Sequence, residues 1–208
     1  MIKGYTGALF ELFLFFKLFS NIMNYSESFK SINPIVSYWL GFTVLTGFWE
    51  LVYITNKKEI NEYANHLIAN NKSVWFSDYN FTMIFPHNFS KLFYSEYAAW
   101  ADREYMSFSD NWSITIEGSH CILCGLFSLV ALWSLVTGHY NNFLLALGIA
   151  MGSQFMNSLL YLSEYMLQTK DINNINYNNK EFPTGEYLLK RSFMYVNILW
   201  LILPAYSI

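Results

Sequence analysis

Three glutamates and a histidine lie in stretches of this chain that are otherwise apolar. Glu50, Glu117 and Glu164 fall inside segments long enough to cross a membrane, and His120 follows Glu117 by about one helical turn. Charged groups are costly in a bilayer, so carboxyl groups at such depth indicate a functional site. One buried carboxyl group can act as an acid while a second carboxylate or an imidazole accepts a proton. These residues therefore predict a pocket that moves protons on an apolar substrate or binds an amphiphilic cation.

The composition favours an integral membrane protein. Of the 208 residues, 54% are hydrophobic and only 13% are charged, whereas soluble domains carry about 25% charged residues. The formal charge of -3 is small and no basic stripe is present, so we expect no nucleic-acid partner. Cys121 and Cys124 flank apolar residues on one segment beside His120, with no second cluster of ligands. We therefore expect no metal site.

Hydrophobic stretches predict the number of membrane helices. A spanning helix needs about 20 mostly apolar residues, and four stretches qualify: 36–55, 113–138, 143–168 and 188–206. Residues 1–24 form a further hydrophobic helix that either crosses the membrane or lies at its interface. Strands are excluded because open sheet edges cannot face lipid. The prediction is an all-α integral membrane bundle of four to five transmembrane helices.

The connections between these spans differ greatly in length. Residues 56–112 form a long loop, in which 58–70 reads as a short amphipathic helix and the stretch around Pro86 as turn-rich. A tight turn over 139–142 joins the second and third spans. We treat 36–206 as one membrane domain that contains this long loop.

Polar residues recur at spacings of three and four in each span, which places them on one face of each helix. The sets are Thr43, Thr46 and Glu50; Glu117 and His120; Gln154, Asn157, Tyr161 and Glu164; and Asn197 and Trp200. The three glutamates each lie about five to six residues from the long-loop end of their helices, or about 8–9 Å deep. Inward-facing stripes would line one pocket. Alternatively, the polar groups only join helices by hydrogen bonds, His120 pairs with Glu117 or a neighbouring helix, and Trp200 is ordinary packing.

Three segments occur in an order that resembles the EXPERA superfamily. They are "EYAAWADREYMSFSDNWSITIEG", "GSQFMNSLLYLSEY" and "NILWLILP". This superfamily includes emopamil-binding proteins, which are 8,7-sterol isomerases, and related sterol- and drug-binding receptors. The resemblance covers about 36–206, most of the chain.

The resemblance assigns roles to particular residues. Glu50 and Glu117 match the family's two membrane glutamates, and Thr46 stands where the isomerases have histidine. His120 in turn stands at a family threonine position. The remaining matches and near-matches are Asp102 and Tyr105 in the "ADREY" stretch, Asn157 at a frequent aspartate position, Tyr161 and Glu164 in the third span, and Asn197 and Trp200 in the last.

The resemblance implies a five-span bundle in the endoplasmic reticulum membrane, often dimeric, that needs no cofactor. An isomerase of this family protonates a sterol double bond, passes through a carbocation and removes a different proton. Its catalytic residues here would be Glu50, Glu117, His120 and Trp200. Substrate would be bound by Thr46, Asp102, Tyr105, Asn157, Tyr161, Glu164 and Asn197.

Two other functions fit the same resemblance. One is a non-catalytic receptor for sterols or amphiphilic amines, and the other is a subunit of a large membrane complex, with the mitochondrial inner membrane as its location. The expected partners are thus a membrane lipid or sterol, a second copy of the chain or a membrane complex. The enzyme hypothesis requires the four predicted catalytic residues to converge on one sterol-sized cavity.

Overall fold

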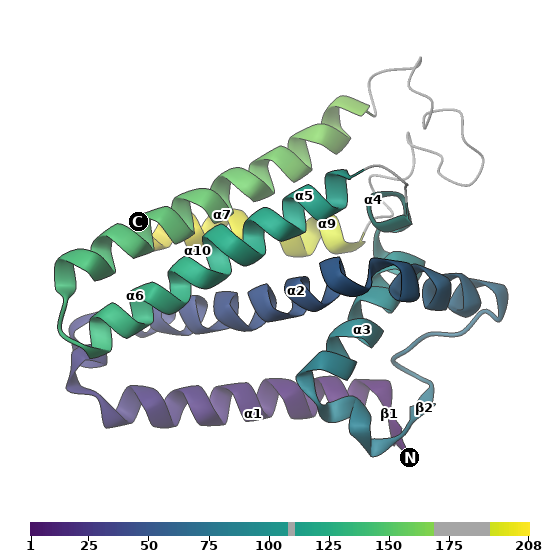
Figure 1. Cartoon of the computed structure of the whole chain (residues 1–208), viewed down its shortest axis with the longest axis horizontal. Coiled ribbons are helices and arrows are strands. Elements are labelled where there is room, and N and C mark those ends of the chain that lie inside the picture. Colours follow the sequence, from purple (N-terminus) through teal and green to yellow (C-terminus); the bar gives the residue numbers. More distant parts are fainter. Residues whose placement is uncertain (108–110, 169–191) are drawn as a thin grey trace.

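The structure, a computed structural model, describes residues 1–107, 111–168 and 192–208. Helices dominate these residues, as Figure 1 shows, which confirms the all-α prediction. The one sheet in the described part has two strands of two residues each, β1 (Ile2–Lys3) and β2 (Asp78–Tyr79). They pair antiparallel, with Ile2 opposite Tyr79. This short ladder anchors the start of the chain to the segment that precedes helix α3.

Four helical stretches are long and apolar enough to cross a membrane. They are α1 (Gly4–Tyr25), α2 (Pro34–Ala69), the continuous run α5–η4–α6 and α7 (Tyr140–Gln168). The run consists of α5 (Trp112–Ser119), the π-helical η4 (His120–Leu126) and α6 (Phe127–Val136). Three of these stretches contain or overlap the predicted spans 36–55, 113–138 and 143–168, and α1 corresponds to the hydrophobic helix predicted over 1–24.

The structure describes only residues 192–206 of the predicted C-terminal span, and 188–191 lie outside the described residues. In this described part, Ile198 alone separates helix α9 (Ser192–Asn197) from helix α10 (Leu199–Ser207). Together they provide only a shorter apolar helix, Tyr195–Ser207. Pro204 lies inside α10 and cannot donate a backbone hydrogen bond there. In Figure 1 this pair lies behind α5 and α7.

Helix α2 is longer than the sequence indicated. It joins the predicted span 36–55 and the predicted amphipathic helix into one element of 36 residues, with non-helical backbone angles only at Asn56. The Asn56 side chain donates to the carbonyl oxygen of Val52 at 2.8 Å, which stabilises the bend. At the other end, Asn33 caps the helix by accepting from the Ile35 N–H at 2.9 Å.

The segment predicted as a long loop contains further helices. Pro86 begins α3 (Pro86–Glu96), because proline is well suited to the first helical position, where its missing N–H leaves no hydrogen bond unmade. The π-helical η3 (Tyr97–Ala101) and the short α4 (Arg103–Ser107) follow. Two short 3-10 helices, η1 (Glu27–Ser31) and η2 (Phe81–Ile84), complete the described helices. In Figure 1, α3 crosses the end of the bundle beside α2. Phe89 and Tyr94 of α3 belong to one core cluster with Trp49 and Tyr53 of α2.

Large apolar side chains remain exposed on the outer surfaces of the long helices. Leu9 and Phe13 of α1, Trp133 of α6 and Leu145 of α7 are each more than 60% exposed. Such surfaces suit contact with lipid, since soluble monomers rarely expose large contiguous apolar patches. The fold is therefore compatible with an integral membrane protein.

Two glycines set the distance between α2 and η4. A Cβ atom on Gly47 would lie 2.9 Å from the Gly125 Cα, and one on Gly125 would lie 3.1 Å from the Gly47 Cα. These contacts are with backbone atoms, so an added methyl group must push the helices apart. This close crossing brings the side chains that follow Gly47 on α2 near those of η4.

We expect Gly47→Ala to lower the free energy of unfolding by about 1–3 kcal/mol, because overpacking forces the backbone to shift. Thermal unfolding in detergent measures the effect. Gly148→Ala is the matched control, since a Cβ atom at Gly148 meets nothing within 4 Å. Equal stability of the two variants would contradict the close crossing.

Candidate functional site

A cavity of about 370 Å³ lies between the helices, toward the end of the bundle that α3 covers. Its size falls in the range of about 300–1,000 Å³ that is usual for small-molecule sites. Its walls come from α1, α2, α3, η3, α4, α5, η4, α7, α9 and α10, with Trp75 contributed by the segment before β2. The wall residues that carry no hydroxyl, amide or ionisable group are Ala8, Leu12, Phe42, Trp49, Trp75, Phe89, Phe93, Ile116, Val196 and Trp200. The cavity is thus mostly apolar and rich in aromatic rings.

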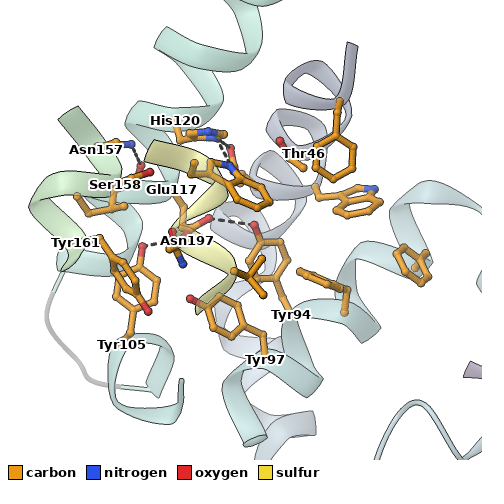
Figure 2. Close-up of a pocket in the computed structure, with 18 of the residues that line it drawn as sticks. Thr46, Tyr94, Tyr97, Tyr105, Glu117, His120, Asn157, Ser158, Tyr161 and Asn197 are labelled. Carbon is orange, nitrogen blue, oxygen red and sulfur yellow. Dashed lines mark hydrogen bonds and ion pairs between the residues drawn. The ribbon is translucent and has the colours of Figure 1, made fainter. Parts of the chain in front are cut away.

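The polar residues of the cavity largely coincide with those predicted from the sequence. The predicted residues that line it are Thr46, Glu50, Tyr105, Glu117, His120, Asn157, Tyr161, Asn197 and Trp200. Figure 2 shows most of these side chains gathered around the same space. The helical spacing therefore identified the faces that turn inward. The side chain of Glu164 lies outside the described residues.

His120 pairs with Glu50, one of the two partners that the sequence left open. Its Nδ1 lies 2.6 Å from the Glu50 carboxylate, and both side chains are buried. The contact joins α2 to η4, so His120 bonds to a neighbouring helix rather than to Glu117. His120 is the first residue of the π-helical turn, and π-bulges often redirect side chains at functional sites.

A second set of contacts holds the far side of the His120 ring. Gln154 Nε2 lies 2.8 Å from His120 Nε2 and 3.3 Å from Thr43 Oγ1. The indole N–H of Trp39 donates to Gln154 Oε1 at 2.7 Å. The sequence placed Thr43 and Gln154 on polar faces as residues that join helices, and they do so. It gave no signal for Trp39, which reads as an ordinary aromatic residue of a membrane helix.

Glu117 is held by two tyrosine hydroxyl groups. Tyr105 donates to Glu117 Oε1 at 2.7 Å and Tyr94 to Oε2 at 3.0 Å. Burial, and then the nearby charge of Glu117, raise the pKa of Tyr94 well above its usual range, so Tyr94 remains a donor. Tyr94 comes from α3, within the segment that the sequence treated as loop, and sequence reasoning therefore missed it.

Asp102, which the resemblance assigned to substrate binding, supports the site from behind its wall. It is fully buried but does not line the cavity. It accepts hydrogen bonds from the Tyr161 hydroxyl and, at 3.2 Å, from the backbone N–H of Tyr105. The two tyrosine rings meet edge to face at 4.9 Å. Asp102 directly follows the π-helical η3, and its two hydrogen bonds orient both tyrosines.

We expect Asp102→Ala to lower the free energy of unfolding by about 1.5–3 kcal/mol, because buried donors lose a charged acceptor. Thermal unfolding measures this loss. Tyr161→Phe keeps the ring and removes one of the donors, so it should cost less than Asp102→Ala. The double variant should then be no worse than Asp102→Ala alone, and additive losses would contradict the shared hydrogen bond.

The remaining predicted residues complete the walls. Asn157 donates to the Ile116 carbonyl oxygen at 3.0 Å and accepts from Ser119 at 3.0 Å, so it fastens α7 to α5. The Trp200 ring meets the Trp39 ring edge to face, with centroids 5.3 Å apart. Trp200 thus both lines the cavity and packs against the residue that holds Gln154.

Among the described residues, no group of three or more histidine, cysteine or acidic side chains is placed to hold a metal ion. Cys121 and Cys124 are free thiols. The described side chains available for chemistry at the site include carboxyl groups, an imidazole, phenols and aromatic faces.

Comparison of the chain with known protein families, with curated proteins and with solved structures finds no match.

Proposed function

We propose that this protein is a membrane isomerase of the 8,7-sterol type, which moves a ring double bond by proton transfer inside the cavity. The observation that carries the proposal is the placement of Glu50 and Glu117. These two carboxyl groups come from different helices and face one cavity with mostly apolar, aromatic walls. Such a cavity suits a rigid apolar ring system that must meet two proton-handling groups.

The reaction balances with the two carboxyl groups alone. One glutamate in its acid form gives a proton to C9 of a C8=C9 double bond, which leaves a carbocation at C8. The other glutamate, as a carboxylate, removes a proton from C7, and the electron pair of that C–H bond forms C7=C8. The substrate gains and loses one proton, and the two glutamates exchange protonation states. Exchange of protons with water restores the starting protonation states before the next turnover.

Aromatic rings can support the cation between these two steps. Trp200 lines the cavity from α10, and the face of an indole ring attracts positive charge. The phenol rings of Tyr94, Tyr105 and Tyr161 lie around Glu117. A cation formed between the carboxyl groups would thus meet both negative charge and aromatic faces.

The exchange of Thr46 and His120 relative to the family supports relocation of the imidazole. Thr46 donates to the Thr43 carbonyl oxygen at 3.2 Å on its own helix, whereas His120 reaches Glu50 from η4. Glu50 therefore keeps an imidazole neighbour, supplied by a different helix. We infer that the protein resides in the endoplasmic reticulum membrane, as the resemblance implies, with the mitochondrial inner membrane as the alternative.

A binding function is favoured by the same walls. Two acidic groups surrounded by aromatic rings suit an amphiphilic amine, because both attract a cation. In that case the protein is a receptor that holds a sterol or an amine without converting it, either alone, as a homodimer or within a membrane complex.

Expression in a host strain that lacks its own 8,7-sterol isomerase tests the enzyme proposal. The wild-type chain should restore Δ7-sterol production, and Glu117→Gln should not. A well-expressed wild-type protein that fails to restore it would count against catalysis. Saturable binding of a sterol by that protein would then favour the receptor, and stable co-purification with other membrane proteins would favour the subunit.

A further inference from the structure

We propose that Gln154 fixes His120 as a neutral imidazole with its single proton on Nδ1, so that His120 positions Glu50 and transfers no proton itself. The tautomer follows from hydrogen-bond geometry. The assignment of His120 as a positioning residue rests on the proposed isomerase function. Resemblance had placed His120 among the catalytic residues, so this inference changes its role.

The argument starts at Trp39, whose indole N–H can only donate. It donates to one side-chain atom of Gln154 at 2.7 Å, so that atom must be the amide oxygen. The other amide atom is then the NH₂ group, which lies 2.8 Å from His120 Nε2. An NH₂ group can only donate, and His120 Nε2 must therefore accept. The neutral ring consequently carries its proton on Nδ1.

Thr43 independently supports this orientation of the amide. Its hydroxyl group donates to the Trp39 carbonyl oxygen at 2.9 Å, which leaves the oxygen free to accept. Gln154 Nε2 lies 3.3 Å from that oxygen. The reversed amide would set NH₂ against the Trp39 N–H in a part of the bundle where Gln154 is fully buried. Only the first orientation of the Gln154 amide gives Trp39, Thr43 and His120 each a suitable hydrogen-bond partner.

Nδ1 lies 2.6 Å from a carboxyl oxygen of Glu50, so the proton on Nδ1 points at that oxygen. His120 thus donates to the carboxyl group on one side and accepts from an amide on the other. A second proton on Nε2 would face the NH₂ group of Gln154 and would break the contact. Glu50 of α2 faces Nδ1, and Glu117 of α5 interacts electrostatically with the ring. Tyr94 on α3 and the thiols of Cys121 and Cys124 on η4 interact with Glu50. From α7, the neutral Gln154 faces Nε2, and the ionisable Tyr161 lines the same cavity.

Proton transfer in the proposed reaction is therefore confined to Glu50 and Glu117. The role of His120 is to hold the Glu50 carboxyl group at a fixed angle to the cavity. An asparagine at position 120 can place a donor N–H close to the position of Nδ1, but it cannot act as an acid or base. His120→Asn and His120→Leu consequently separate positioning from proton transfer.

Nitrogen NMR of protein labelled with ¹⁵N-histidine, in lipid nanodiscs near pH 7, tests the tautomer without any substrate. The chain has four histidines, so the His120 signal is identified by its loss in His120→Asn. We expect a protonated Nδ1 and an unprotonated Nε2. Gln154→Glu, which is nearly the same size, should place a proton on Nε2. A protonated Nε2 in the wild type, or an unchanged tautomer in Gln154→Glu, would overturn the inference.

Turnover of a Δ8-sterol tests the role. His120→Asn should keep activity within about tenfold of wild type, while His120→Leu should lose about 100-fold, as expected when a reacting group is misplaced. Equal losses in both variants would overturn the positioning role. If the wild type itself has no activity, the isomerase proposal fails, whereas the NMR result still decides the tautomer.

Discussion

Glu117→Gln is expected to bind sterol nearly as well as the wild type and to convert it at least about 10²–10⁴-fold more slowly. Glutamine keeps the size of the side chain and its oxygen can still accept from Tyr105 or Tyr94, but it can neither give nor take a proton. Conversion is measured as Δ7-sterol formed from Δ8-sterol in nanodiscs. Binding is measured by the fluorescence of dehydroergosterol.

Glu11→Gln is the matched control for this variant. Glu11 is a buried carboxyl group on the membrane helix α1, but it does not line the cavity. The Glu11→Gln variant should therefore retain wild-type turnover. An active Glu117→Gln protein, or an equally inactive Glu11→Gln protein, would contradict the role of Glu117.

Ala8→Trp is expected to weaken dehydroergosterol binding by at least about tenfold, which corresponds to 1.4 kcal/mol. Ala8 faces the cavity from α1, so an indole ring there would occupy space that the ligand needs. Neither carboxyl group is altered, and any loss of turnover must follow from the loss of space.

Leu9→Trp provides the comparison for the cavity-filling variant. Leu9 is the next residue on the same helix and is 63% exposed on the outer surface. An indole ring there points away from the cavity and should leave binding unchanged. Equal affinity of the two variants would show that the ligand does not occupy the cavity beside α1.

Much of the site could be predicted because membrane helices obey a simple periodicity. Polar residues three and four apart must share a face, and an apolar bilayer leaves such faces only the interior of the bundle. Thr46 and Glu50 on α2, and Asn157 and Tyr161 on α7, follow this rule and line the cavity. The chain's low charge and long apolar runs likewise predicted the all-α bundle.

The partners across helices could not be predicted in the same way. The pairing of His120 with Glu50 depends on the close crossing at Gly47 and Gly125 and on the π-helical register of η4. The sequence predicts a regular helix there, because no local pattern indicates that a helical turn is π-helical and therefore wider. Trp39 likewise gains its role only through a contact with Gln154, 115 residues away in the chain.

The polar segment between the first two spans was the weakest part of the prediction. The sequence predicts a long loop there, whereas α3 packs against α2 and Tyr94 of α3 donates to Glu117. Asp102 seemed a binding residue from its place in the matched "ADREY" stretch, whereas it orients Tyr105 and Tyr161 from behind the wall. Both placements depend on tertiary packing, because local sequence alone does not decide which side of a short helix or turn faces a cavity.

The most direct test of the central proposal is isomerisation in deuterated water. Purified protein in nanodiscs is incubated with a Δ8-sterol in D₂O, and the product is analysed by mass spectrometry and NMR. If the two glutamates protonate C9 and deprotonate C7, the product is a Δ7-sterol that has gained one deuterium at C9. Recovery of unlabelled Δ8-sterol, from a protein that binds dehydroergosterol saturably, would contradict the enzyme and leave a binding protein.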